Sequence, residues 1–559
     1  MKRRRLAIVL LLSACLFGGA ARAANDPQYA VATANPAATD AGMRILSMGG
    51  SAADAAVAIQ MVLGVVEPQS SGLGGGAIAL YHSAQERRMT AFDGLAKSPE
   101  AYDPQAGAVA HFSHSGAAVG VPGALRMLEA MHRRYGKLPW DTLFQPAIEL
   151  AERGFPVSPY LARSLAAASR AGMEPPGWLS DGSSKPVTEG TTVRNPALAE
   201  TLRAVAMHGA DALYVDLADR IVSATRPGAP SGHLSTADLA RYQAVERTPL
   251  CLPLRQHVLC AFPPPSYGGV VVLEMLGILD KRGPSLDSFL DLGFVHRFIE
   301  AGRLAEADRM ALVGDPDTGR VAVGELLSPA HLQARAALIR DTSVIEDPSA
   351  GQPHPGCAQV ERAPEPSTSQ ISVVDAWGNA LAMTTTINVN FGAWLSVGGF
   401  FLNDAMTNFS QPSAGGCTAN DPAGGKRPET SMAPVIALGT DGSVALVGGS
   451  AGAGEIVDYV AQAVLELFAG ENPAVALDQG HVSTARASYP ATTGVVELER
   501  ERAIAQLAPR LTALGHRIQV RPLQSGTAFI LRVHGRWEGA ADPRRDGSYA
   551  SSGSSRPQP

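Results

Sequence analysis

A cluster of hydroxyl residues, 367–369 (Ser-Thr-Ser), follows a proline-rich loop and precedes two segments typical of β-strands. These segments, 370–375 and 380–388, alternate between apolar and polar residues and flank a turn, so they predict a β-hairpin with hydroxyls at its entrance. A threonine hydroxyl is a weak nucleophile until a base activates it. The nearest base is its own α-amine, which is freed when the preceding peptide bond is cut and has a pKa of about 7.7 to 8. Thr368 is therefore a candidate nucleophile, although such a cluster taken alone is more often a solvated turn.

Ser450 is a rival nucleophile. Residues 448–452 fit the pattern G-x-S-x-G, with a strand-like segment before them and an amphipathic helix, 456–468, after them. That is the context of the nucleophilic serine in α/β-hydrolases. The side chains that could complete a triad in the right chain order are Asp458 or Asp478 with His481, His516 or His534. Few βα units follow Ser450, however, which counts against this fold.

Composition limits the functional classes. The chain has 559 residues, 45% hydrophobic and 18% charged, which is typical of a globular protein and allows one large α/β architecture or more than one core. Its formal net charge of −6 offers no basic surface for nucleic acid. The cysteines and histidines show no metal-ligand spacing, so we expect no metal and no cofactor.

Two other segments are informative about backbone geometry. The glycine cluster at 71–76 follows a predicted helix and precedes a strand-like segment, which is the reverse of a dinucleotide-binding loop, so it predicts a close backbone approach in the core. Ser51 is a suitable N-cap for a helix over 52–65, and 35–46, 270–279 and 300–312 are also predicted helices, the last amphipathic. The final residues, 550–559, are predicted to be a disordered tail.

The first 23 residues are typical of an export signal, with a basic start, an apolar core and the small-residue site Ala21-Arg22-Ala23. We therefore expect a periplasmic or secreted protein. Residues 12–15 (Leu-Ser-Ala-Cys) also resemble a bacterial lipobox, in which Cys15 would carry a membrane anchor, and this alternative stays open.

Export favours disulfide formation among the remaining cysteines. Cys251 and Cys260 lie symmetrically in a predicted short hairpin and could form a cross-strand bond. Cys357 and Cys417 lie on opposite sides of Thr368, so a bond between them would tether two cleavage products. The alternative is that all four are free and buried.

The segment TSQISVVDAWGN, which starts at Thr368, resembles the start of the small subunit in the γ-glutamyltranspeptidase family. In that family a precursor cleaves itself before a threonine, which becomes the nucleophile of an N-terminal-nucleophile hydrolase. Gln370 stands where the family usually has histidine. Residues 49–58 and 66–76 (VEPQSSGLGGG) provide an independent second match, and the resemblance extends from about Tyr29 to Tyr549.

The resemblance implies an α/β fold of αββα type: two stacked sheets between helical layers. Cleavage between Ser367 and Thr368 would follow a signal at 1–23 and give a large subunit, 24–367, and a small subunit, 368–559, which stay together as a heterodimer. An acyl group from a small amide would pass through Thr368 to water or an amine. The other residues that the family pattern assigns are Thr386 beside the amine, Asn388 at the substrate's amino end, Gly452 and Ala453 as oxyanion donors, and Thr430 and Ser431 as donors to the substrate.

The substrate-head positions depart from the family pattern. Leu95 replaces the arginine that would bind an α-carboxylate, and Asn408 replaces the aspartate that would bind an α-ammonium, while Ala405 replaces a glutamine. Lys97 could compensate if it lies on the same strand face as Leu95. We therefore expect an amide hydrolase whose acyl group lacks the amino-acid head. The alternatives are an ordinary γ-glutamyl enzyme, the Ser450 hydrolase, and an uncleaved homologue that only binds ligand.

Overall fold

The computed structural model describes residues 28–102, 114–226, 234–283, 289–319, 323–348, 367–410, 419–486 and 494–553. The predictions for the export signal, Cys15, Cys357 and Cys417 lie outside these ranges. Within the described part of the chain, no helix is both long enough and apolar enough to cross a membrane.

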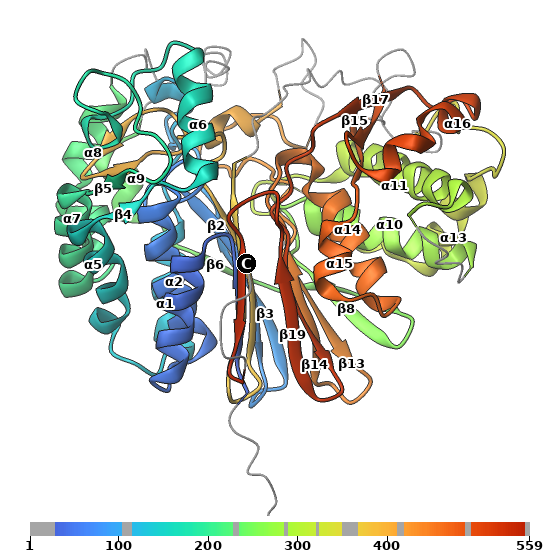
Figure 1. Cartoon of the computed structure of the whole chain (residues 1–559), viewed down its shortest axis with the longest axis horizontal. Coiled ribbons are helices and arrows are strands. Elements are labelled where there is room, and N and C mark those ends of the chain that lie inside the picture. The colour runs from blue at the N-terminus through green and yellow to red at the C-terminus, as the bar shows by residue number, and fades with distance from the viewer. Residues whose placement is uncertain are drawn as a thin grey trace, which may run out of the picture.

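Two large antiparallel sheets lie face to face at the centre of the molecule (Figure 1). The first has the order β20-β1-β9-β10-β2-β3-β6 and the second β19-β18-β14-β13-β8-β7. The strands of the first sheet are β1 (Ala30–Thr33), β2 (Gly76–Ser83), β3 (Arg88–Gly94), β6 (Val245–Arg247), β9 (Ser369–Val374), β10 (Ala380–Thr386) and β20 (Ser548–Ser551). Those of the second are β7 (Leu250–Leu254), β8 (His257–Ala261), β13 (Val435–Gly439), β14 (Val444–Gly449), β18 (Ala528–Val533) and β19 (Arg536–Ala541).

Helices cover the outer faces of both sheets, which gives four layers (Figure 1). Beside the first sheet are α1 (Pro36–Ser47), α2 (Ala52–Val66), α4 (Ala124–Tyr135), α5 (Gln145–Arg153), α6 (Pro159–Arg170), α7 (Pro196–His208), α8 (Ala218–Thr225) and α9 (Thr236–Arg241). Beside the second are α10 (Gly268–Arg282), α11 (Leu292–Leu312), α12 (Val323–Leu326), α13 (Pro329–Leu338), α14 (Ile456–Phe468), α15 (Pro473–Asp478) and α16 (Ala508–Ala513). Shorter strands complete the fold: β4 (Phe155–Pro156), β5 (Thr192–Val193), β11 (Ser396–Val397), β12 (Phe400–Phe401), β15 (Val482–Arg486), β16 (Val495–Glu499) and β17 (Ile518–Arg521).

The side chains of the first sheet explain this layering. In β2, Ile78 and Leu80 join the core between the sheets, whereas Ala79 and Tyr81 pack with the helices on the other face. Successive strand residues point to opposite faces, so a strand such as β2, which is buried at every position, needs cover on both sides. The predicted αββα sandwich is the arrangement that supplies it.

The predicted helix over 52–65 is confirmed as α2. Ser51 accepts a hydrogen bond from the backbone N–H of Asp54, and the Asp54 carboxylate accepts one from the backbone of Ser51 in return. This capping box fixes the start of the helix. The helix ends at Glu67, directly before Pro68, and so delivers the Glu67 side chain to the interior.

Other predicted boundaries differ from the structure. α10 and α11 begin earlier than predicted, and the prediction that 300–312 is amphipathic is wrong, because α11 is buried from Phe294 to Arg309 apart from Arg297. The prediction of a disordered tail is also wrong for Ala550 and Ser551, which belong to β20 and pair with β1. These two residues lie at an edge of the sheet, where strand pairing orders them despite their polar surroundings in the sequence.

The predicted bond between Cys251 and Cys260 is confirmed. The two residues lie opposite each other on β7 and β8 and form a disulfide. The hairpin brings the two Cα atoms to 4.0 Å.

Candidate active site

The hairpin of β9 and β10 brings Thr368 and Thr386 together. Its register pairs Ser369 with Thr385, so the next residues outward, Thr368 and Thr386, lie side by side. The Thr368 hydroxyl donates a hydrogen bond of 3.0 Å to Thr386 Oγ1, which also accepts one of 2.8 Å from the backbone N–H of Asn388. The predicted hairpin is confirmed, and it places the candidate nucleophile against the threonine expected to assist it.

Thr368 has a strained backbone. Its φ is 98°, in a region that β-branched residues rarely adopt. Such strain persists only where the surroundings hold the residue. Arg545 Nη1 donates to the Thr368 carbonyl at 2.9 Å, and the Ser367 hydroxyl donates to the carbonyl of Gln69 at 3.0 Å. The peptide bond between Ser367 and Thr368 is therefore fixed from both sides in a buried position.

A buried carboxyl group lies next to this bond. Glu67 accepts a 2.8 Å hydrogen bond from the hydroxyl of Ser369, one residue beyond Thr368. Burial raises the pKa of Glu67 to about 8, against the opposing effects of the Ser369 hydrogen bond and the positive charge of Arg545. Glu67 is therefore mostly protonated near neutral pH.

The glycine cluster makes the close backbone approach predicted for it. A Cβ atom on Gly74, Gly75 or Gly76 would lie less than 3.0 Å from the backbone of another segment. For Gly75 that neighbour is the carbonyl oxygen of Thr386, and for Gly74 it is that of Phe401. The cluster thus lets β2 pack directly against the strand that carries Thr386.

Asn388 connects the hairpin to the segment expected to bind the substrate head. Its Nδ2 donates to Thr407 Oγ1 at 3.0 Å and to the carbonyl of Asp404 at 3.3 Å. Asn408 is partly buried in the same short helical segment, and its carbonyl accepts a 2.8 Å hydrogen bond from Asn420. The predicted substrate-binding residues Asn388 and Asn408 therefore belong to one contiguous region.

The predicted oxyanion loop follows β14 and contains two residues with positive φ, Gly452 at 138° and Ala453 at 57°. Ser431 Oγ donates to the Ala453 carbonyl at 2.6 Å, which brings two predicted site residues into contact. The hydroxyl of Thr430 accepts a 3.3 Å hydrogen bond from the Met432 N–H, so it is engaged with its own segment.

The Ser450 triad is a wrong prediction. Ser450 is fully buried, and its hydroxyl donates to the adjacent Ala451 carbonyl at 2.7 Å. The candidate histidines have other partners or lie elsewhere: His481 bonds Ser525, His516 bonds His296, and His534 is exposed in the turn after β18. The candidate acids are engaged too, Asp458 with Thr484 and Asp478 with Arg502. The antiparallel sheets also exclude the α/β-hydrolase fold.

Two of the predicted substrate-head positions, 95 and 405, carry apolar side chains that pack into hydrophobic clusters. Leu95 is 5% exposed and belongs to the core between the sheets, while Ala405 packs with Tyr102, Met406 and Phe409 in a small separate cluster. The prediction that Lys97 shares a strand face with Leu95 is wrong, because β3 ends at Gly94. Lys97 instead forms an ion pair of 3.3 Å with Glu100. Lys97 therefore does not replace the positive charge that position 95 lacks.

Among the residues that the structure describes, two groups of side chains have a spacing that could hold a metal ion: His296, Glu300 and His516, and Glu274, Asp308 and His331. In each group the ligand atoms already bond one another, as in the 2.7 Å contact between His296 and His516. Both lie in the second helical layer, apart from the hairpin that carries Thr368.

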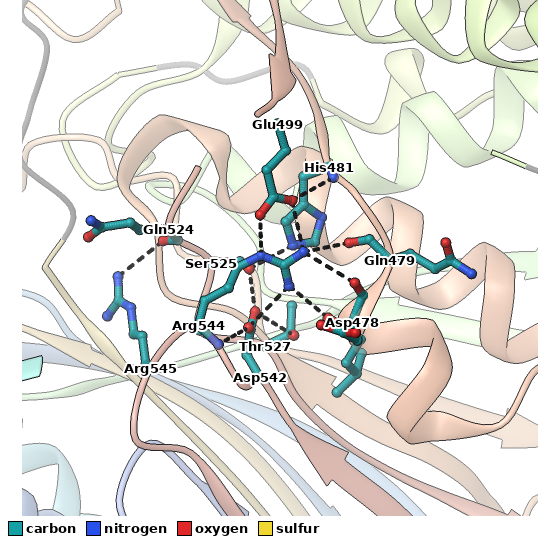
Figure 2. A network of polar contacts seen from close by, with 12 residues as sticks. Asp478, Gln479, His481, Glu499, Gln524, Ser525, Thr527, Asp542, Arg544 and Arg545 are labelled. Carbon is teal, nitrogen blue, oxygen red and sulfur yellow. Dashed lines mark hydrogen bonds and ion pairs between the residues drawn. The ribbon is translucent and has the colours of Figure 1, made fainter. Parts of the chain in front are cut away.

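Sequence reasoning missed Arg545 and Glu67. Figure 2 shows Arg545 and its neighbour Arg544 pointing to different sides of the chain. Arg544 donates to Glu499 and Asp542, whereas Arg545 donates to Thr368 and, at 3.4 Å, to the Gln524 carbonyl. Arg545 carries no local signal, because it lies 177 positions from Thr368 in the sequence. Glu67 offered one weak signal, a charged residue directly after an apolar helix.

Two antiparallel sheets between helical layers, with a threonine directly before a central strand, are the arrangement of the N-terminal-nucleophile hydrolases. Residues 38–552 match the family model described as gamma-glutamyltranspeptidase. The chain belongs to this family, which includes glutathione hydrolases and acylases.

Relatives of both kinds are similar over nearly the whole chain. The glutathione hydrolase proenzyme of Bacillus subtilis (strain 168) is 31% identical, covering 93% of this chain and 90% of the relative. The Acylase ACY 1 proenzyme of Pseudomonas sp. (strain SE83) is 34% identical, covering 93% and 92%. Among solved structures, the cephalosporin acylase from Bacillus halodurans superimposes with a TM-score of 0.80 at 26% identity, covering 94% of this chain and 96% of that one.

Proposed function

We propose that this protein is a self-processing amide hydrolase in which Thr368 cuts the chain before itself and then attacks amide substrates. The observation that carries the proposal is the 3.0 Å hydrogen bond between the Thr368 and Thr386 hydroxyls at a residue with a strained backbone. The two relatives named as proenzymes support it.

Self-cleavage uses the bond that the structure holds in place. Thr368 Oγ1 attacks the carbonyl carbon of Ser367, the C–O bond forms, the C–N bond breaks, and the hydroxyl proton ends on the freed α-amine. Water then hydrolyses the ester, which leaves a carboxylate on Ser367 and restores the hydroxyl. Strained backbone conformations cost about 1 to 3 kcal/mol, and breaking this peptide bond releases that strain, so it favours cleavage.

In the cleaved enzyme the freed α-amine of Thr368 accepts the proton of its own hydroxyl as the hydroxyl attacks an amide carbonyl. The leaving amine takes that proton, and water or a second amine then releases the acyl group. Thr386 orients the hydroxyl, and the backbone N–H groups of Gly452 and Ala453 stabilise the oxyanion. Alanine at position 453 retains the N–H donor that this role requires.

The acyl group that fits the site lacks the charged head of a γ-glutamyl group. Leu95 and Asn408 provide neither the positive nor the negative charge that such a head needs, and Lys97 is paired with Glu100. Each missing charge-assisted contact weakens binding by about 1.5 to 3 kcal/mol. The similarity to a cephalosporin acylase and to Acylase ACY 1 supports an acylase with this altered preference.

Denaturing electrophoresis of the purified protein tests the self-cleavage. We expect two fragments that meet at Ser367 and Thr368, and a single intact chain for Thr368→Ala. Ser450→Ala is the matched control and should still cleave. An intact, active wild-type chain that loses activity in Ser450→Ala would contradict the proposal, and an intact chain without amidase activity would indicate the ligand-binding homologue.

Four p-nitroanilides test the acyl preference on the cleaved enzyme. The γ-glutamyl compound carries both head groups, the glutaryl compound lacks the ammonium, the 4-aminobutyryl compound lacks the carboxylate, and the butyryl compound lacks both. We expect kcat/KM for butyryl to equal or exceed that for γ-glutamyl. A kcat/KM for the γ-glutamyl compound at least 100-fold higher than for the others would show that the site binds both charged groups of the head.

A further inference from the structure

We propose that Arg545 is a positioning residue that fixes the main chain of Thr368 and disfavours the protonated form of its α-amine. The inference rests on the proposed self-cleavage, since that amine exists only after the chain is cut. The nucleophile would then depend on the segment between β19 and β20, which lies 177 positions further along the chain.

The first support is the position of the guanidinium group. Arg545 Nη1 lies 2.9 Å from the carbonyl oxygen of Thr368. The α-amine that cleavage would create belongs to the same residue, so the positive charge lies close to it. A like charge within about 4 to 6 Å disfavours protonation of an amine and lowers its pKa by roughly one unit or more. An α-amine with an ordinary pKa of about 7.7 to 8 would then be mostly unprotonated at neutral pH.

The second support is that Arg545 is buried without a carboxylate partner. It is 6% exposed, and within the described residues it makes no ion pair. The adjacent Arg544 shows the usual arrangement, because its guanidinium binds the carboxylates of Glu499 and Asp542. Burying an unpaired charge is costly, so a role that needs this charge explains its retention.

The surroundings hold Arg545 in this place through contacts other than ion pairs. Its guanidinium lies 4.6 Å from the ring centre of Tyr160 on α6, and its Nη2 donates to the Gln524 carbonyl at 3.4 Å. The aromatic face stabilises the cation, and the two carbonyl contacts fix its direction. Figure 2 shows the side chain directed toward Gln524, away from the carboxylates around Arg544.

Three other groups face the same region. Glu67, at the end of α2, is mostly protonated near neutral pH and so adds little negative charge. Asp546 is engaged with the backbone N–H of Tyr160 at 3.3 Å, and Asp404 with that of Val389 at 3.1 Å. Of these charged groups, Arg545 is the one that donates a hydrogen bond directly to the main chain of Thr368.

The test is the pH dependence of kcat and kcat/KM for amide hydrolysis by the cleaved enzyme. For the wild type we expect the acidic limb of kcat/KM to have an apparent pKa below 7. Arg545→Gln retains a donor but removes the charge and should raise that pKa by roughly one unit or more, lowering kcat at pH 6 by about tenfold with little change in KM. Arg545→Lys keeps the charge and should retain the wild-type limb.

Arg163→Gln is the matched control, since Arg163 also lies beside the Tyr160 ring but contacts the Arg544 carbonyl instead of Thr368. It should leave the limb unchanged. A wild-type limb at or above pH 8 would overturn the inference without any variant. An unchanged limb in Arg545→Gln, or an equal shift in Arg545→Lys, would also overturn it. A wild-type chain that is never cut would instead refute the proposed function.

Discussion

Gly75 lies directly against the carbonyl oxygen of Thr386, the residue whose hydroxyl contacts Thr368. A Cβ atom at position 75 would come closer to that oxygen than Cβ atoms essentially ever do, and the neighbour is backbone, which cannot rotate away. Because these glycines have no side chains, the cluster can pack against the β9–β10 hairpin that carries Thr368 and Thr386 and so fixes its position.

Gly75→Ala should accordingly displace β10 and impair self-cleavage. We expect little or slowly cut protein and a large loss of stability, above roughly 3 kcal/mol if the strand cannot shift. Denaturing electrophoresis and thermal unfolding measure both effects. Gly72→Ala is the control in the same loop, because a Cβ there meets only Gly64 Cα at 3.9 Å, and it should behave like the wild type. Normal cleavage of Gly75→Ala would show that the close contact is not needed.

Thr386→Val should slow catalysis while the fold persists. The substitution keeps the shape of the side chain but removes the oxygen that accepts from Thr368 and from the Asn388 N–H. We expect kcat for amide hydrolysis to fall by about 10² or more, in the range typical of lost proton-transfer assistance. Thr385→Val is the control, since that hydroxyl makes only a 3.4 Å contact with Gly76 O. Equal kcat values in the two variants would show that the Thr386 hydroxyl does not assist catalysis.

The local elements around this site could be predicted because their signals are local. Ser51 and Asp54 form a capping box within four residues, and the hairpin of β9 and β10 follows from alternation around a short turn. Arg545 and Glu67 could not be predicted, because their contacts with Thr368 and Ser369 depend on how β20 and α2 pack across the sheet. The same limit explains Lys97, whose expected direction required β3 to continue past Gly94. Periodicity indicates which face a residue occupies, but only tertiary packing decides where a strand ends.

Ala453→Gly should stabilise the protein without loss of activity. Ala453 has φ 57°, a left-handed conformation that costs a non-glycine residue about 1 kcal/mol or more relative to glycine. Glycine keeps the backbone N–H proposed for the oxyanion. Thermal unfolding and kcat measure the outcome, and Gly452→Ala is the opposing variant, because φ is 138° there and a Cβ would lie 2.6 Å from the Tyr459 ring. A destabilised Ala453→Gly enzyme would mean that the alanine methyl makes contacts worth more than the strain.

Glu67 should make the stability of the protein decrease between about pH 4.5 and pH 8. Burial raises the pKa of this carboxyl from 4.5 to about 8, so within that window the folded state holds one proton that the unfolded state has lost. Stability then falls by about 1.4 kcal/mol for each pH unit; below the window both states are protonated, and above it both are ionised, so the slope vanishes. Glu67→Gln cannot titrate, so its stability relative to the parent chain should increase from pH 5 to pH 8.

The measurement is thermal unfolding at both pH values in a Thr368→Ala background, which prevents self-cleavage from mixing one-chain and two-chain species. Glu200→Gln is the control, because Glu200 is exposed on α7 and its substitution should shift stability equally at pH 5 and pH 8. If Glu67→Gln also changes stability by the same amount at the two pH values, the Glu67 carboxyl is ionised in the folded protein throughout. The hydrogen bond from Ser369 would then be one to a carboxylate, and Arg545 would have a charged partner beside the nucleophile.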